Sequence, residues 1–252
     1  MKNRFRSRLM SGELLAGTMV TLGSPEVAEL LAEVGFDWLF VDAEHSPLGP
    51  AQLQRVMQGA GRETPCLIRL PSAGEVAIKK ALDSGAAGII VPQINTAQAA
   101  ANVVRMAKYA PDGQRGVGVS RAHGYGLNFG EYVSGANEAV TVVVQAEHIE
   151  AVRNIEQIVA VPGIDAVLVG PYDLSASLGK LGRVNDPEVR AAIDQVTEAC
   201  LQAGVRLGIF GMTFGAVKPY IEAGYTLIVA GIDTALLGQA AGKLLAQIKQ
   251  PE

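Results

Sequence analysis

Eight short runs of apolar, mostly β-branched residues recur along the chain, and this rhythm constrains its fold more than any other feature. Continuous apolar runs of this length suit strands of a parallel sheet that is buried on both faces. We therefore expect a mainly parallel sheet. The runs cover residues 15–20, 38–43, 66–70, 88–93, 141–147, 166–170, 206–210 and 226–230.

Amphipathic helical patterns separate these runs. One helix is expected to begin after Ser24, its N-cap, and to stop at Gly35. Another is expected over residues 148–163, with one apolar face formed by Ile149, Val152, Ile155 and Val159. Eight strands alternating with helices in about 250 residues predict a (β/α)8 TIM barrel. An open doubly wound sheet is the alternative.

Two further helices are predicted near the end of the chain. Asp186 and Pro187 open one that stops at Gly204, and residues 234–249 form the last one. The stretch between the fourth and fifth runs is long, and residues 110–130 are expected to form an elaborated loop after the fourth strand. No linker interrupts the pattern, so residues 1–252 are predicted to form a single domain.

Composition excludes several classes of protein. A net charge of −4 argues against a nucleic-acid-binding surface, which usually needs a basic face. No apolar run reaches the roughly 18–20 residues that span a bilayer, so no membrane association is expected. The basic N-terminal segment lacks a continuous apolar stretch, so a short amphipathic helix is expected there, with a transit peptide as the alternative, and the protein is expected to be cytoplasmic. Cys66 and Cys200 have no metal or redox spacing and are expected to be buried, reduced thiols.

Ionisable side chains gather at the ends of the predicted strands and not at their starts. In a barrel of this kind the chemistry lies at the C-terminal ends of the strands, so these residues are candidates for an active site. The candidates are Asp42, Glu44 and His45 after the second run, Arg69 in the third, Gln145 and Glu147 in the fifth, and Asp173 after the sixth.

Glu147 and Asp173 are candidate metal ligands. Glu147 shares a strand face with Gln145 and Val143, which should turn the two polar side chains into the mouth of the barrel. Asp173 follows a tight turn that could return its carboxylate over the same mouth. Two carboxylates form a hard oxygen site that favours Mg²⁺ or Mn²⁺. The alternative is a solvated strand end at Glu147 and a helix cap at Asp173.

His45 and Arg69 are candidates for the chemistry itself. Imidazole exchanges protons near neutral pH, so His45 could act as a general base. Arg69 lies in an apolar strand and could clamp a carboxylate or an enolate oxygen; the alternative is a structural ion pair with Asp83 or Glu63. No lysine ends a predicted strand, so a Schiff-base mechanism lacks its nucleophile.

Several motifs, in order along nearly the whole chain, resemble the HpcH/HpaI aldolase family of metal-dependent (class II) pyruvate aldolases. They include "WLFVDAEHSP", "IRLP", "KKALDSGAAGIIVPQI", "VVVQAEHIEAVRNIEQI" and "GIDAVLVGPYDLSASLG". The family includes 4-hydroxy-2-oxoheptanedioate and 2-keto-3-deoxyglucarate aldolases. The chain departs from the family pattern at Ala43, Tyr172, Ile232 and residues 208–214, which bear on the choice of aldehyde.

The resemblance implies reversible cleavage of a 4-hydroxy-2-oxo acid into pyruvate, or hydroxypyruvate, and an aldehyde, with Mg²⁺ or Mn²⁺, or else Co²⁺ or Zn²⁺. It also implies a homohexamer in which the last helix is exchanged between subunits. The resemblance implies that Glu147 and Asp173 bind the metal, that His45 acts as the base with support from Asp83, and that Arg69 stabilises the enolate. It implies substrate contacts from Gln145, Tyr172, Arg69 and Asp173. Asp42 and Glu44 are implied to be supporting residues in the site.

Other functions remain open on the sequence. A decarboxylase or lyase acting on oxaloacetate-like acids could use the same metal-bound enolate. A non-catalytic barrel that acts as a binding protein would show no metal dependence. An isomerase of phosphorylated sugars is disfavoured, because the segments after the last two strands lack a phosphate-binding glycine pair.

Overall fold

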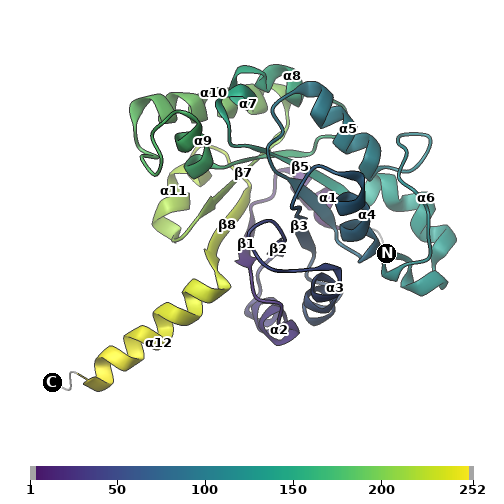
Figure 1. Cartoon of the computed structure of the whole chain (residues 1–252), viewed down its shortest axis with the longest axis horizontal. Helices are drawn as coiled ribbons and strands as arrows, with labels where there is room; N and C mark the ends of the chain where they lie inside the picture. The colour runs from purple at the N-terminus through teal and green to yellow at the C-terminus, as the bar shows by residue number, and fades with distance from the viewer. Residues whose placement is uncertain (1–3, 250–252) are drawn as a thin grey trace.

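A closed barrel of eight parallel strands forms the centre of the protein in a computed structural model that describes residues 4–249 (Figure 1). Each strand pairs with the next one along the chain, and β8 closes the barrel on β1. The predicted (β/α)8 barrel is confirmed, and closure excludes the doubly wound sheet. The strands are β1 Leu15–Val20, β2 Trp38–Asp42, β3 Cys66–Arg69, β4 Gly88–Val91, β5 Thr141–Ala146, β6 Ala166–Val169, β7 Arg206–Gly211 and β8 Leu227–Ile232.

Helices surround the barrel and connect its strands (Figure 1). They are α1 Arg4–Ser11, α2 Pro25–Val34, α3 Pro50–Gly59, α4 Glu75–Asp83, α5 Ala97–Ala107, α6 Phe129–Ala139, α7 Ile149–Arg153, α8 Ile155–Val159, α9 Pro171–Ser177, α10 Pro187–Ala203, α11 Phe214–Glu222 and α12 Asp233–Lys249, with a 3₁₀ helix, η1, at Arg121–Gly126. None of the helices in this part of the chain is long and apolar enough to cross a membrane.

The predicted helix ends are confirmed where the sequence placed a cap. The hydroxyl of Ser24 accepts a hydrogen bond from the N–H of Val27, and Gly35 ends α2 in the left-handed region at φ 98°. Asp186 caps α10 in the same way, and Gly204 ends it at φ 70°. These local signals suffice because capping depends only on residues close in sequence.

One expectation needs correction. The single helix predicted over residues 148–163 is two short helices, α7 and α8, because Asn154 leaves the helical conformation while its side chain donates a hydrogen bond to the carbonyl of Asn95. The loop predicted for residues 110–130 is found after α5: residues 110–120 contain no helix or strand, and η1 and the start of α6 lie in the rest of the segment.

The strands divide the core into two parts. Side chains of one parity fill the barrel interior, where Trp38, Phe40 and Val143 are buried. Trp38 fits because its neighbour in β1 is Gly17, where an added Cβ would lie 2.6 Å from the indole. Side chains of the other parity pack against the helices and form the larger cluster. Both cysteines are buried and free as predicted, and burial raises the pKa of each thiol to about 12.

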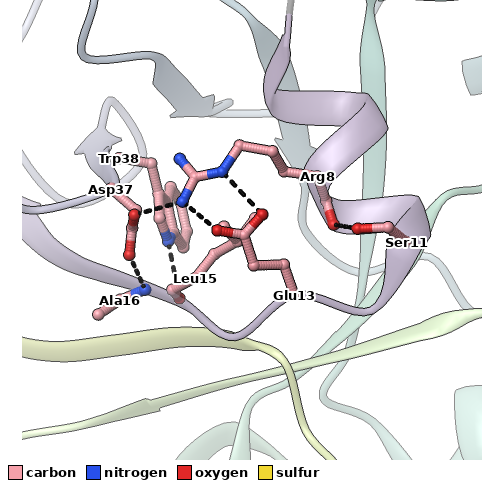
Figure 2. Close-up of polar contacts among 7 residues, drawn as sticks. All are labelled: Arg8, Ser11, Glu13, Leu15, Ala16, Asp37 and Trp38. Carbon is pink, nitrogen blue, oxygen red and sulfur yellow. Dashed lines mark hydrogen bonds and ion pairs between the residues drawn. The ribbon is translucent and has the colours of Figure 1, made fainter.

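Helix α1 closes the N-terminal end of the barrel, which we call the floor. Its Phe5 and Leu9 are buried in the interior cluster. The guanidinium of Arg8 bridges the carboxylates of Glu13 and Asp37, and Asp37 also accepts the N–H of Ala16 at the start of β1 (Figure 2). The predicted amphipathic N-terminal helix is thus confirmed for the described residues; residues 1–3 lie outside them.

Helix α12 extends away from the barrel (Figure 1). Of its residues, Asp233 alone is buried, where it accepts hydrogen bonds from the backbone N–H groups of Thr21 and Leu22. The remaining side chains of the helix, including Leu237 and Ile248, are largely exposed. The helix is therefore attached at one end and leaves an apolar surface uncovered within a single chain.

Candidate active site

The C-terminal end of the barrel, which we call the mouth, brings together polar side chains from β2, β3 and β5 and from the segments that follow β2, β5 and β6. The segment after β4 adds a backbone N–H group. The strand register brings two of these side chains together, because Asp42 and Arg69 are paired at the ends of β2 and β3. Residues in register on adjacent parallel strands have side chains on the same face. The two opposite charges therefore meet inside the mouth.

Asp42 organises the segment after β2. Its Oδ1 accepts hydrogen bonds from Arg69 Nε at 2.8 Å and from the backbone N–H of Glu44 at 3.0 Å. The N–H of His45 lies 3.4 Å from the same oxygen. Only 1% of Asp42 is exposed, so these donors replace its water. Asp42 thus anchors both the arginine and the turn that presents Glu44 and His45.

Arg69 is held from three sides. Its Nε lies 2.8 Å from Asp42 and 3.3 Å from Glu44, and its guanidinium lies over the Phe40 ring at 5.2 Å. Burial by itself would lower the pKa of Arg69, but the hydrogen bond and charge of Asp42, with Glu44 and Glu147 nearby, keep that pKa above its ordinary value. The ion pair that the sequence left open exists, but with Asp42 and Glu44 and not with Asp83 or Glu63.

His45 stands at the rim of the mouth. Its side chain is 67% exposed, and its Nε2 lies 3.6 Å from a carboxylate oxygen of Glu44. Burial raises the pKa of Glu44, although the charges of Arg69 and His45 oppose the rise. The imidazole is thus open to solvent on one side and faces an acid on the other, an arrangement suited to proton exchange.

Glu147 lies one residue beyond β5 and is only 3% exposed. Its Oε1 accepts the backbone N–H of Gln93 at 2.8 Å, and its Oε2 accepts Gln145 Nε2 at 2.7 Å. Burial raises the pKa of Glu147 to about 7, helped by the negative charges of Glu44 and Asp173. Among residues 4–249 its direct partners are neutral donors, so this buried carboxylate has no cation of its own.

Asp173 reaches the mouth from the first turn of α9. It is exposed, and its charge raises the pKa of both Glu147 and Glu44, which places the three carboxylates in one electrostatic environment. Gly170, between β6 and α9, makes this approach possible. A Cβ at Gly170 would lie 2.8 Å from the Cβ of Glu147 and 3.1 Å from its Oε2.

The donors at this site fit a hard divalent cation. Glu147 and Asp173 supply carboxylate oxygens, and the Oε1 of Gln145 is buried without a hydrogen-bond partner among the residues that the structure describes. Oxygen donors of this kind suit Mg²⁺ or Mn²⁺, which usually keep water or substrate oxygens in their remaining positions. Within residues 4–249 there is no cluster of three or more His, Cys, Asp or Glu side chains able to enclose a metal. A cation here would need ligands from substrate or water.

The remaining expectations concern residues 208–214, which include Phe210, and also Tyr172 and Asp83. The side chain of Phe210 in β7 packs against the barrel interior, whereas Tyr172 in α9 is 65% exposed. Asp83 ends α4 and pairs with Arg115 at 2.8 Å. The C-terminal end of a barrel helix adjoins the starts of the strands, so Asp83 lies towards the floor of its own chain. Its role beside His45 stays a prediction.

Two residues that sequence reasoning missed complete the site. Gln93 supplies a backbone N–H to Glu147, and Gly170 supplies space beside it. Gln93 comes two residues after β4, and Gly170 comes directly after β6. Their positions after strand ends are the one feature of the sequence that could have marked them as candidates. A backbone donor carries no side-chain signature, and a glycine before proline in a turn has many explanations, so neither contact could be read from the sequence.

A (β/α)8 barrel with carboxylates, an arginine and a histidine at its mouth defines a class of barrel enzymes, which includes carbon–carbon lyases. The family model described as HpcH/HpaI aldolase/citrate lyase matches residues 16–240. The chain therefore belongs to the HpcH/HpaI aldolase/citrate lyase family, as its motifs predicted.

Individual relatives resemble the chain along nearly its whole length. It is 40% identical to a 4-hydroxy-2-oxovalerate aldolase of Rhodococcus jostii, over 98% of this chain and 96% of that one. It is 36% identical to a hydroxypyruvate/pyruvate aldolase of Paraburkholderia phytofirmans, over 98% of each. A crystal structure of a family protein from Burkholderia cenocepacia matches with a TM-score of 0.94 and 37% identity, over 98% of this chain and all of that one.

Proposed function

We propose that this protein is a metal-dependent aldolase that reversibly cleaves 4-hydroxy-2-oxo acids to pyruvate, or hydroxypyruvate, and an aldehyde. The observation that carries the proposal is Glu147, a buried carboxylate with neutral hydrogen-bond donors and, within residues 4–249, no cation paired with it. Family membership and the names of relatives that act on 2-oxo acids support it. Residues 1–252 act as one catalytic domain in this proposal.

Glu147 and Asp173 would hold the metal, which is Mg²⁺ or Mn²⁺ on the chemistry of the oxygen donors. A bound divalent cation supplies Lewis-acid polarisation of the 2-oxo acid. Gln145 lies beside Glu147 and has a free buried carbonyl oxygen, so it contacts the substrate or its water. Gln93 and Gln145 keep the Glu147 carboxylate in place while substrate enters and leaves.

Arg69 stabilises the negative charge that develops on the substrate. In the cleavage direction the C4 hydroxyl gives up its proton, the C3–C4 bond breaks, and the bonding electrons pass into the enolate of the 2-oxo acid. Arg69 is fixed by Asp42 and Phe40 before this charge appears, and such preorganised donors give large rate effects. Asp42 and Glu44 support the arginine and the turn.

His45 exchanges the protons of the reaction. It takes the hydroxyl proton of the substrate, directly or through water, as the aldehyde leaves, and its conjugate acid can return a proton to C3 of the enolate. The exposed ring at the rim and the carboxylate of Glu44 at 3.6 Å support this role. Synthesis runs the same steps in reverse, beginning with removal of a C3 proton.

The aldehyde and the assembly are the finer parts of the proposal. Phe210 and Tyr172 shape the side of the mouth where the aldehyde sits. The exposed apolar residues of α12 support a homohexamer in which this helix packs on a neighbouring subunit. A role for Asp83 beside His45 then requires Asp83 of a second chain, because within one chain it pairs with Arg115.

Exchange of the C3 protons of pyruvate with deuterated water tests the proposal most directly. We expect exchange to stop in a chelator, to return with Mg²⁺ or Mn²⁺, and to slow by about 10²–10⁴-fold in His45→Ala. Undiminished exchange in the chelator would refute the metal site, and unchanged exchange in His45→Ala would remove that residue as the base. Oxaloacetate with detection of CO₂ distinguishes a decarboxylase from an aldolase.

A further inference from the structure

The chain turns sharply at Gln93, two residues after β4. Gln93 has φ 56°, and it shares the left-handed region with only one other non-glycine residue among residues 4–249, Tyr125 at φ 58°. Side chains with a Cβ rarely adopt this conformation because the Cβ crowds the backbone. Such residues persist where the surrounding structure requires them, and they gather at functional sites.

The turn at Gln93 delivers one hydrogen-bond donor to Glu147. The N–H of Gln93 lies 2.8 Å from Oε1 of Glu147, on the opposite oxygen from the amide of Gln145. The Gln93 side chain, by contrast, is exposed. With the described residues, Gln93 forms its hydrogen bond through the backbone N–H. The feature of Gln93 that the site uses is therefore its backbone conformation.

The chain on both sides of Gln93 is fixed. Val91 and Pro92 before it are buried at the end of β4, and Ile94 after it is 2% exposed. A residue that rejects positive φ can be accommodated between these anchors only if the peptide plane between residues 92 and 93 rotates. That rotation would turn the N–H away from Glu147.

We propose that Gln93 is a positioning residue whose left-handed backbone aims an N–H at Glu147 and fixes this carboxylate for metal binding. This inference rests on the proposed metal site. The side chain at position 93 matters through the backbone angles that it permits. Replacements should therefore rank by their tolerance of positive φ, with glycine first, asparagine next, then residues unbranched at Cβ such as glutamine and alanine, and the β-branched residues valine and threonine last.

Calorimetric titration of the metal-free protein with Mn²⁺ tests the ranking without measuring activity. We expect Gln93→Gly and Gln93→Asn to bind Mn²⁺ within about threefold of the wild type, since both accept the turn. We expect Gln93→Val to bind about 10–100-fold more weakly, the loss typical when a group that orients a metal ligand is removed. Gln93→Val should also lower the Tm, whereas Gln93→Gly should not.

Tyr125 provides the matched control, because it has the same backbone conformation in η1, away from the mouth. Tyr125→Val should lower the Tm as Gln93→Val does but leave Mn²⁺ affinity unchanged. Equal weakening in Gln93→Gly and Gln93→Val would overturn the inference by showing that the side chain acts directly. If Gln93→Val does not fold, Gln93→Thr replaces it, because threonine is also β-branched and should weaken Mn²⁺ binding in the same way.

The two proposals fail in different ways. Wild-type protein that binds no Mn²⁺ would refute the metal site itself. Wild-type protein that binds Mn²⁺, with Gln93→Val or Gln93→Thr binding it equally well, would refute the role of Gln93 and leave the metal site standing.

Discussion

The two ends of the barrel both contain arginines and carboxylates, but they use them differently. At the floor two carboxylates each have an arginine close by. Arg8 lies 2.6 Å from Asp37 (Figure 2), and Arg6 lies 2.8 Å from Asp165. At the mouth Arg69 is already shared by Asp42 and Glu44, while Glu147 has neutral partners.

This difference separates stability from function. The floor pairs its charges and attaches α1 to the starts of the strands, so it holds the barrel closed. The mouth has an excess of negative charge, and burial raises the pKa of Glu147 to about 7. An environment that disfavours a buried charge is one that a bound cation can stabilise, which is why perturbed carboxyls gather at functional sites.

The largest expected effect contrasts the arginines of the two ends. Arg69→Met should lower kcat by about 10²–10³-fold, the loss typical when a donor to developing charge is removed. Arg8→Met should leave kcat per folded molecule within about twofold, because it acts only through stability. Steady-state kinetics on both variants measures this contrast. An equal loss in the two would show that the floor and the mouth are not separate in function.

Removing apolar contact at the floor should reduce stability without affecting the chemistry. Leu9 is fully buried under the barrel, so Leu9→Ala should lower the free energy of unfolding by about 2–5 kcal/mol. Urea denaturation measures the change. Leu14→Ala is the control, because Leu14 is 49% exposed. Weaker Mn²⁺ binding by folded Leu9→Ala would contradict the division between the two ends.

At the mouth, removal of a charge should increase stability. The folded pKa of Glu147, about 7, lies above its ordinary value of 4.5, so between these values the folded chain keeps a proton that the unfolded chain has lost. The stability that the folded chain gains by holding this proton is therefore fully present below about pH 4.5 and is lost as the pH rises through 7. In a chelator at pH 8, Glu147→Gln should be more stable than the wild type by roughly 2–3 kcal/mol.

Denaturation at a series of pH values checks this sign. The gain in Glu147→Gln should shrink toward zero as the pH falls below about 4.5, since the wild-type carboxyl is then mostly protonated in both the folded and the unfolded state. A wild type that is more stable than Glu147→Gln at pH 8 without metal would contradict the argument from burial.

The smallest effect concerns the ion pairs of Arg8. These side chains are partly exposed, so Arg8→Met should lower the free energy of unfolding by only about 1 kcal/mol. The difference should narrow in 1 M NaCl, where exposed charges are screened. A double-mutant cycle of Arg8→Met with Asp37→Asn measures the coupling free energy between Arg8 and Asp37. A coupling that is insensitive to salt would show that the floor pair behaves as a buried one.

Much of the fold could be predicted because its signals are local. Apolar runs located all eight strands, and Ser24, Gly35, Asp186 and Gly204 located helix ends. The split between α7 and α8 could not be predicted in this way. The apolar face continues through the break, and the contact of Asn154 with Asn95 joins residues 59 positions apart.

The sequence by itself determined the barrel, the strand ends that contribute polar side chains, and the family, since strand periodicity and motifs depend on neighbours along the chain. Tertiary structure decided the partners. It joined Arg69 to Asp42 and Glu44, placed Asp83 beside Arg115, and aimed the N–H of Gln93 at Glu147. Those contacts depend on strand register and on the direction of backbone groups. Both are fixed only when segments distant in sequence pack against one another.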